Sequence, residues 1–385
     1  MEYKTRKKTA AKSLIMDRHN SAFKAFCQHT GRAILLAITA IPTLSIIFIL
    51  FFIAKEALPF FENISYVKEF FTSTNWTPSK DTNPHFGALA IFYGTAMVTV
   101  GSCVIAVPLG IIAAVCLNEI LPHNLAQKFK PVVELLAAVP SVAYGFFALV
   151  VFAPILQNHG GAMMSVAAVL AGLPIALVAS VLMGEFFSSK FFGEKESTAK
   201  KLVKIIFPCA ASIAVLWIAA KLFDIEISSG TNALNASLIL AIMALPTIVS
   251  ISQDALSAVG RDMREGALAL GSTRFETIFK ILLPCAKSGI AVAVILGFMR
   301  VVGETMVVWM ASGNALKIPE PFYNFFEPVR TLTATIAGEM GEADQSTGSA
   351  RYHVLFAMSF CLLVAGLLMN AASQWIGSGM KLKKK

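Results

Sequence analysis

The sequence predicts an all-α, polytopic integral membrane protein with about eight transmembrane helices. Of its 385 residues, 56% are hydrophobic and only 14% are charged, and the mean hydropathy is +0.69. Apolar runs long enough to cross a hydrocarbon core of about 30 Å recur along the chain. Basic residues gather at both ends and in short loops, which is typical of cytoplasmic segments beside membrane spans. This composition argues against a soluble domain, and the charge pattern argues against a nucleic-acid binder, whose basic residues would cover a folded face.

The two ends of the chain carry most of the positive charge. Residues 1–32 hold eight Lys and Arg against Glu2 and Asp17, and four lysines lie in residues 377–385. The formal net charge of the whole chain is +9, so the residues between these ends have a net charge of −1. We therefore predict a basic cytoplasmic arm over 1–32 and a basic cytoplasmic tail over 377–385.

The first span is predicted over 33–54, which is 22 residues without a charge, and a polar external loop over 55–87 follows it. A transmembrane domain is expected over 88–376. Its crossings are predicted at 88–117, 132–156, 162–183, 202–223, 236–251, 281–310 and 353–376. Eight crossings place both basic termini and the lysine-rich loops on one side, with a short turn at 157–161 on the other.

The third predicted span contains a candidate kink in a transport pathway, formed by Pro140, Ser141, Tyr144 and Gly145. Proline and glycine in the middle of a span release backbone groups, which then need partners in the protein or along a hydrated path. A kink that serves helix packing alone is the alternative interpretation.

The seventh predicted span carries two charged residues, Arg300 and Glu304. They are four residues apart, so on a continuous helix they share a face. A charge at this depth costs several kcal/mol unless it is paired or hydrated, and it usually faces a cavity or substrate path. The planar guanidinium fits a tetrahedral oxyanion, and Glu304 would balance its charge when the path is empty. A structural ion pair that locks the helix to a neighbour is the alternative.

A polar loop over 252–284 joins the sixth and seventh spans, with a short helix expected on each side of Gly271. It contains Glu265, Gly266, Ala267, Gly271, Ile281, Leu283 and Pro284. The spacing resembles the coupling loop of ABC importer permeases, which reads Glu-Ala-Ala, three residues, Gly, nine residues, Ile, one residue, Leu-Pro. Only Gly266 departs from it. The resemblance implies a type I ABC importer permease fold with six core helices, about two extra spans over 160–226, and a loop that is held by an ATPase subunit.

A second resemblance narrows the family. Gly297 to Met306, which includes Arg300 and Glu304, is similar to the corresponding helix of phosphate-specific permeases, and residues 86–89, 93–95, 134–141 and 331–342 agree with their PstC type. This implies an anion pathway through Arg300 and Glu304 in a bacterial inner membrane. It also implies four partner chains, namely a second permease (PstA-like), two ATPase subunits (PstB-like) and an external phosphate-binding protein (PstS-like).

The chain lacks a Gly-x-x-x-x-Gly-Lys-Ser/Thr loop, so we expect a separate subunit to hydrolyse ATP and this chain to be no enzyme. Six His and six Cys show no paired spacing, and no metal or other cofactor is expected. Three alternatives remain. They are a permease for another oxyanion such as molybdate or sulfate, an ATPase-independent secondary transporter or channel, and, least favoured, a membrane enzyme.

Overall fold

Helices dominate the computed structural model, which describes residues 18–79, 83–174, 176, 177, 180, 198–224, 227–342 and 349–382. Seven helices in this part of the chain are long and apolar enough to cross a membrane. They are Gln28–Phe61, Leu89–Ile120, Ser141–Leu170, Ile206–Phe223, Ala233–Ser257, Arg274–Val302 and Ala350–Ser378. The predicted all-α, polytopic fold is confirmed. Residues 1–17 of the predicted arm, residues 383–385 of the tail and most of the basic 184–201 loop lie outside the described residues.

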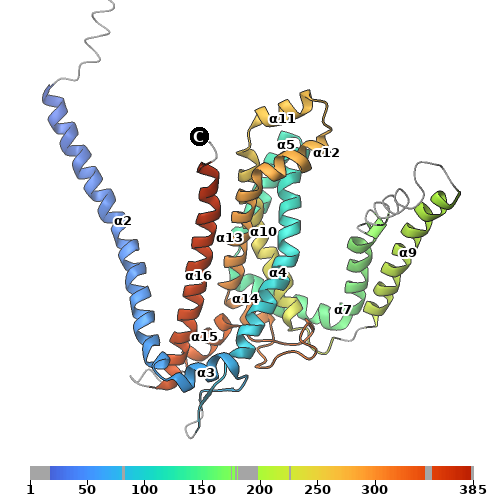
Figure 1. The fold of residues 1–385 in the computed structure, drawn as a ribbon. Helices are drawn as coiled ribbons and strands as arrows, with labels where there is room; N and C mark the ends of the chain where they lie inside the picture. Colours follow the sequence, from blue (N-terminus) through green and yellow to red (C-terminus); the bar gives the residue numbers. More distant parts are fainter. Residues whose placement is uncertain are drawn as a thin grey trace, which may run out of the picture.

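The first long helix stands partly apart from the others. Figure 1 shows α2 (Arg18–Phe61) and α16 (Ala350–Leu382) side by side near α3 (Ile64–Thr72) and diverging toward their other ends. Where they meet, the Phe52 and Phe356 rings lie 5.8 Å apart between centroids. Over residues 34–51 of α2 most large apolar side chains are exposed, as expected where lipid or another membrane protein surrounds a helix.

The predicted external loop 55–87 is a small folded unit. After α2 and α3 come two short antiparallel strands, β1 (Trp76–Thr77) and β2 (His85–Phe86). Phe60, Phe70 and Phe86 are buried together, with Phe60 centroids 5.4 and 5.7 Å from the other two. We call residues 64–86 the cap. Its aromatic side chains form a core, which a polar loop between spans would lack.

The third and fourth predicted crossings differ from the structure. A helix, α5 (His123–Ala138), ends before Pro140, and a continuous helical stretch then runs through residues 141–172. It consists of α6 (Ser141–Phe147), η2 (Ala148–Phe152), α7 (Ala153–Ala167) and η3 (Ala168–Gly172), of which η2 and η3 are π-helical. The predicted turn at 157–161 is therefore wrong, which accounts for seven long helices where eight crossings were predicted. Part of the predicted fourth span, 162–183, lies outside the described residues.

Burial explains why the helix continues through this polar stretch. Gln157, Asn158 and His159 are exposed, whereas Gly160 and Gly161 are buried. A Cβ on Gly160 would lie 2.3 Å from Cδ1 of Ile227, so glycine permits the close approach of the segment after α9 (Thr198–Phe223). The helix thus keeps its polar side chains in solvent and packs its glycines, although glycine costs about 1 kcal/mol in a helix.

The centre of the molecule is a pair of packed helices. The first is α4 (Leu89–Val115), which continues as η1 (Cys116–Ile120), a π-helical turn, and the second is α10 (Ala233–Ser257). Their buried side chains form one cluster with residues of α14 and α15. Ser237 of α10 donates a hydrogen bond to the carbonyl oxygen of Val98 in α4 at 3.3 Å.

The second half of the chain contains the loop and the last core helices. Their order is α11 (Arg261–Ala269), α12 (Arg274–Glu276), η4 (Thr277–Leu282, π-helical), α13 (Leu283–Val302), α14 (Met306–Ala311) and α15 (Leu332–Met340). The span predicted as continuous over 281–310 is interrupted at residues 303–305.

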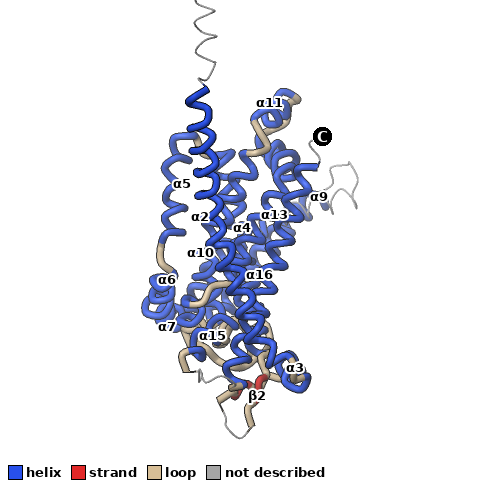
Figure 2. Tube along the Cα trace, turned by 90° about the vertical axis from the view of Figure 1, so that its left-hand side faces the viewer, coloured by secondary structure: helices blue, strands red, loops and turns tan. Residues whose placement is uncertain are grey.

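The ends of the described chain have a clear arrangement. Figures 1 and 2 show the start of α2, the C-terminal end of α16 and the helix α11 at one end of the molecule, and α3 and α15 at the opposite end. We call the first the loop end and the second the cap end. The start of α2, the end of α16 and the 252–284 loop therefore lie at the same end of the described chain.

Candidate functional site

The two charged residues of the seventh span lie at a helix break. Arg300 is in the last turn of α13, whereas Glu304 is in the non-helical segment before α14. The prediction that they share one face of a continuous helix is therefore wrong. Both side chains are partly buried, and within the described residues Arg300 forms no ion pair. Its buried Nε has no hydrogen-bond partner there.

A contact from α15 helps to hold the break in place. The hydroxyl of Thr333 donates a hydrogen bond to the carbonyl oxygen of Glu304 at 2.7 Å. Thr331, the N-cap of α15, accepts a hydrogen bond from the backbone N–H of Ala334 at 3.4 Å. Because the partner of the Glu304 carbonyl comes from a distant segment, the tertiary fold supports the interruption of the span.

Threonine hydroxyls gather beside this break. Thr95 and Thr99 of α4, together with Thr331, Thr333 and Glu304, line a small hollow of about 10 Å³. A space of this size holds about one water molecule. This hollow is too small for a polyatomic anion in this conformation.

The predicted kink residues lie against the same region. Val139 and Pro140 are extended between α5 and α6, so the chain is broken here rather than bent. The Tyr144 hydroxyl donates a hydrogen bond to the carbonyl oxygen of Leu136 at 2.9 Å, across the break from the last turn of α5. Tyr144 also packs against the buried core cluster that contains Val301, the residue after Arg300. The broken segment before α6 and the end of α13 therefore border the same cluster.

The contact between α6 and α14 requires a residue without a side chain at position 145. A Cβ on Gly145 would lie 2.8 Å from Sδ of Met310 and 3.2 Å from the carbonyl oxygen of Met306. Two interrupted spans therefore meet closely where α6 packs on α14. Ser141 lies at the first position of α6, and no hydrogen bond of its side chain is found in the described residues.

The 252–284 loop has the predicted form of two short helices around Gly271. Gly271 has φ +85°, a conformation that favours glycine, and its N–H donates to the carbonyl oxygen of Leu268 at 3.0 Å. The second helix begins with a capping box, in which Thr273 and Glu276 each accept from the other's backbone N–H at 3.2 Å. Pro284 lies where the π-helical turn η4 passes into α13, within the continuous helix Arg274–Val302.

Most of the predicted loop residues are accessible. Glu265 and Gly266 are exposed, Ala267 is buried, and Ile281 and Leu283 are half-buried. The exposed residues include large apolar ones, namely Met263, Leu268, Leu270, Phe275 and Phe279. Exposed apolar side chains grouped on a polar loop are typical of a docking surface.

Two polar clusters were not predicted. At the loop end, Arg264 forms an ion pair with Glu119 of η1, with 2.7 Å between Nη2 and Oε1. At the cap end, Glu339 Oε1 accepts from Trp76 Nε1 at 2.7 Å and from Arg330 Nη2 at 3.2 Å. No local spacing could reveal these pairs, because their partners are far apart in the chain.

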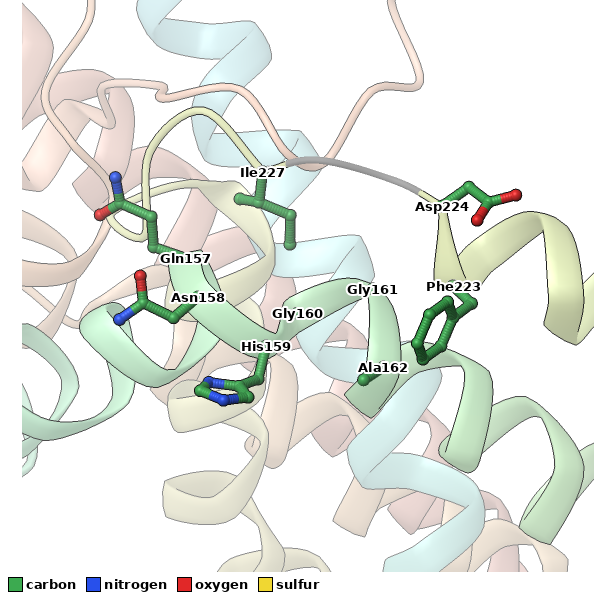
Figure 3. Close-up of a pocket in the computed structure, with 9 residues that line it drawn as sticks. All are labelled: Gln157, Asn158, His159, Gly160, Gly161, Ala162, Phe223, Asp224 and Ile227. Carbon is green, nitrogen blue, oxygen red and sulfur yellow. The ribbon is translucent and has the colours of Figure 1, made fainter.

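A larger hollow lies elsewhere. It encloses about 760 Å³ between α7 and the segment after α9. Figure 3 shows Gln157 and Asn158 pointing away from Asp224, so its polar groups do not converge on a ligand. No group of His, Cys, Asp and Glu able to hold a metal ion is found among the described residues.

A polytopic helical protein with interrupted spans around a buried arginine and an exposed loop of two short helices belongs to the class of membrane permeases. Residues 106–382 match the family described as binding-protein-dependent transport system inner membrane components, and the chain belongs to this family. It is therefore a multi-pass inner-membrane permease protein.

Individual relatives extend over most of the chain. It is 30% identical to the probable ABC transporter permease protein YqgH of Bacillus subtilis, with 97% of both chains covered. It is 32% identical to the phosphate transport system permease protein PstC of Mesorhizobium japonicum, over 80% of this chain and 77% of that one. With PstC 1 of Mycobacterium tuberculosis the identity is 28%, over 79% and 80% of the two chains.

Proposed function

We propose that this chain is a transmembrane permease subunit of an ATP-driven phosphate importer. The observation that carries the proposal is the position of Arg300. Arg300 lies in the last turn of α13, the helix that begins at the exposed coupling loop. Its guanidinium forms no ion pair in the described part of the chain. The single helix α13 thus connects the surface that would bind the ATPase subunits to the side chain that would bind the anion.

The chemistry of the site suits an oxyanion. A guanidinium keeps its charge at any working pH and presents a planar set of donors that matches two oxygens of a tetrahedral anion. Arg264, Arg330 and Arg351 each have a carboxylate partner, whereas Arg300 has none in the described residues. Its guanidinium is therefore open to an additional ligand, either the anion or a group of a second permease (PstA-like). The names of the PstC relatives favour phosphate over sulfate or molybdate.

The two ends of the molecule suit different partners. The loop end, with α11 and α12, would face the cytoplasm and two ATPase subunits (PstB-like), together with the basic termini. The cap end would then face outward, toward a phosphate-binding protein (PstS-like). The hollow of about 10 Å³ beside Glu304 is smaller than an oxyanion, so transport requires its lining segments to separate.

Reconstitution in liposomes tests this function. The chain is co-purified with the products of its neighbouring genes and supplied with ATP, and uptake of radiolabelled phosphate is followed against competing sulfate and molybdate. We expect uptake that depends on both ATP and the ATPase subunits and that only unlabelled phosphate suppresses. Uptake by this chain without an ATPase subunit, or suppression by sulfate or molybdate alone, would contradict the proposal.

A further inference from the structure

A largely buried ion pair ties the first helix of the loop to the helix core. Nη2 of Arg264 in α11 lies 2.7 Å from Oε1 of Glu119 in η1, and the two side chains are 23% and 10% exposed. The loop contains a second ion pair of similar length, Lys280 to Glu276 at 2.9 Å, but these side chains are 73% and 42% exposed. An exposed pair contributes little, whereas loss of one partner from a buried pair is costly.

Further hydrogen bonds extend this pair into a cluster at the ends of two core helices. Asn118 donates to Glu119 Oε1 at 2.6 Å and accepts from the Ser257 hydroxyl at 2.7 Å. The same Nη2 of Arg264 also donates to the carbonyl oxygen of Leu256 at 3.2 Å. Arg264 therefore joins α11 both to η1, which continues α4, and to the last turn of α10.

The helix α11 has few other attachments of this kind. Ala267 is its one buried residue, and Glu265 and Leu268 on the same helix are exposed. A helix with so little apolar burial depends on specific polar contacts for its position. The planar fork of arginine suits this role because one side chain reaches two acceptors with fixed geometry.

The helices reached by Arg264 lead to the candidate pathway. α4 runs without interruption into η1, and near its other end it carries Thr95 and Thr99, which line the hollow beside Glu304. α10 contributes Leu240 to the same hollow. A displacement of α11 would thus act on two of the segments that must separate, in addition to its covalent route through α12 and α13.

We propose that Glu119 and Arg264 are positioning residues that transmit the movement of α11 to α4 and α10 during transport. This inference rests on the proposed function. Loss of a purely structural pair would lower both the assembly of the complex and transport. Loss of a pair that transmits movement should lower transport while the ATPase subunits still bind.

The ratio of phosphate imported to ATP hydrolysed tests the inference in the reconstituted complex. Glu119→Gln and Arg264→Gln are expected to lower this ratio about tenfold or more while the ATPase subunits still co-purify. The double variant Glu119→Arg with Arg264→Glu should recover part of the ratio, because it restores the ion pair but not the hydrogen bond to the Leu256 carbonyl oxygen. Lys280→Gln, which breaks the exposed pair in the same loop, is the matched control and should leave the ratio within about twofold.

The outcomes separate this inference from the proposed function. A normal ratio in both single variants, with normal uptake by the unmodified chain, would overturn the inference alone. No ATP-dependent uptake by the unmodified complex would overturn the proposed function and the inference with it. If the neutral variants fail to accumulate in the membrane, Glu119→Asp decides. It keeps the charge but withdraws the carboxylate by one methylene from Arg264 Nη2, so a normal ratio in it would contradict the inference.

Discussion

The cap and the coupling loop are both polar segments between long helices, but they are folded in opposite ways. In the cap, Phe60, Phe70, Trp76 and Phe86 are buried, and the Trp76 indole is hydrogen-bonded to Glu339. In the loop, Leu270, Phe275 and Phe279 are exposed on two short helices. The comparison teaches that the cap has its apolar partners within this chain, whereas the loop offers apolar side chains that another chain could cover.

The largest expected effect comes from placing a charge on the exposed loop surface. Leu270 is 89% exposed, so Leu270→Asp should leave the melting temperature in detergent nearly unchanged. Loss of a buried anchor from an interface costs about 2 kcal/mol, which is about 30-fold in affinity. Co-purification of the ATPase subunits and ATP-driven uptake measure the effect.

A matched control is available in the cap. Ile64, at the start of α3, is 82% exposed, and Ile64→Asp should change neither the melting temperature nor ATPase binding. If Ile64→Asp and Leu270→Asp lower ATPase binding equally, the distinction between the two regions is wrong.

The next effect is on stability at the cap end. Arg330→Gln leaves Glu339 buried without its ion-pair partner, which should cost about 3 kcal/mol and lower the melting temperature. Replacing both residues, Arg330→Met with Glu339→Gln, should recover much of this loss, because both charges are removed while an amide oxygen can still accept from the Trp76 indole. ATPase binding per inserted molecule should stay normal in both variants. An unchanged melting temperature in Arg330→Gln would contradict the structural role of this pair.

Two glycines of the loop should respond in opposite directions. Gly271 has φ +85°, so Gly271→Ala should cost about 1 kcal/mol. Gly266 is helical with open space at its Cβ position, so Gly266→Ala should stabilise α11 by about 1 kcal/mol. Amide hydrogen exchange in α11 should become roughly fivefold faster in the first variant and slower in the second. Equal exchange rates in the two variants would exclude the turn described for Gly271.

The smallest effect concerns pH in the segment between α14 and α15. A hydrogen bond from Lys317 holds the pKa of Glu327 below its ordinary value of 4.5. A lowered pKa stabilises the fold above pH 4.5, and the contribution is lost as the pH falls through the lowered value. The protection factors of residues 312–331 against hydrogen exchange should therefore fall on acidification, and Lys317→Met should remove this dependence. The same dependence in Lys317→Met would assign it to another group.

Local patterns in the sequence predicted the loop better than the spans. The glycine turn at Gly271, its two flanking helices and Pro284 at the start of α13 follow from spacing alone. The helical path through Gln157 to Gly161 could not be predicted, because it depends on the packing of Gly160 against Ile227. Polar residues and glycine at this point are equally typical of a turn.

Long-range contacts limited the prediction of the site. Arg300 lies in the predicted seventh span, but Glu304 lies outside the helix, in the break after it. The carbonyl oxygen of Glu304 accepts a hydrogen bond from the Thr333 hydroxyl. The pairing of Glu119 with Arg264 likewise joins segments whose proximity only the fold reveals. Residue spacing predicts which side chains share a helix face, but it does not predict where a contact with a distant segment interrupts the helix.

The central claim is that the Arg300 guanidinium binds the transported anion. The most direct measurement compares Arg300→Gln with the unmodified chain in the reconstituted complex, following phosphate uptake and ATP hydrolysis together. We expect uptake to fall at least about 100-fold, equivalent to roughly 3 kcal/mol, while the complex still assembles and hydrolyses ATP. Uptake at the unmodified rate in Arg300→Gln would remove this residue from the pathway and contradict the account.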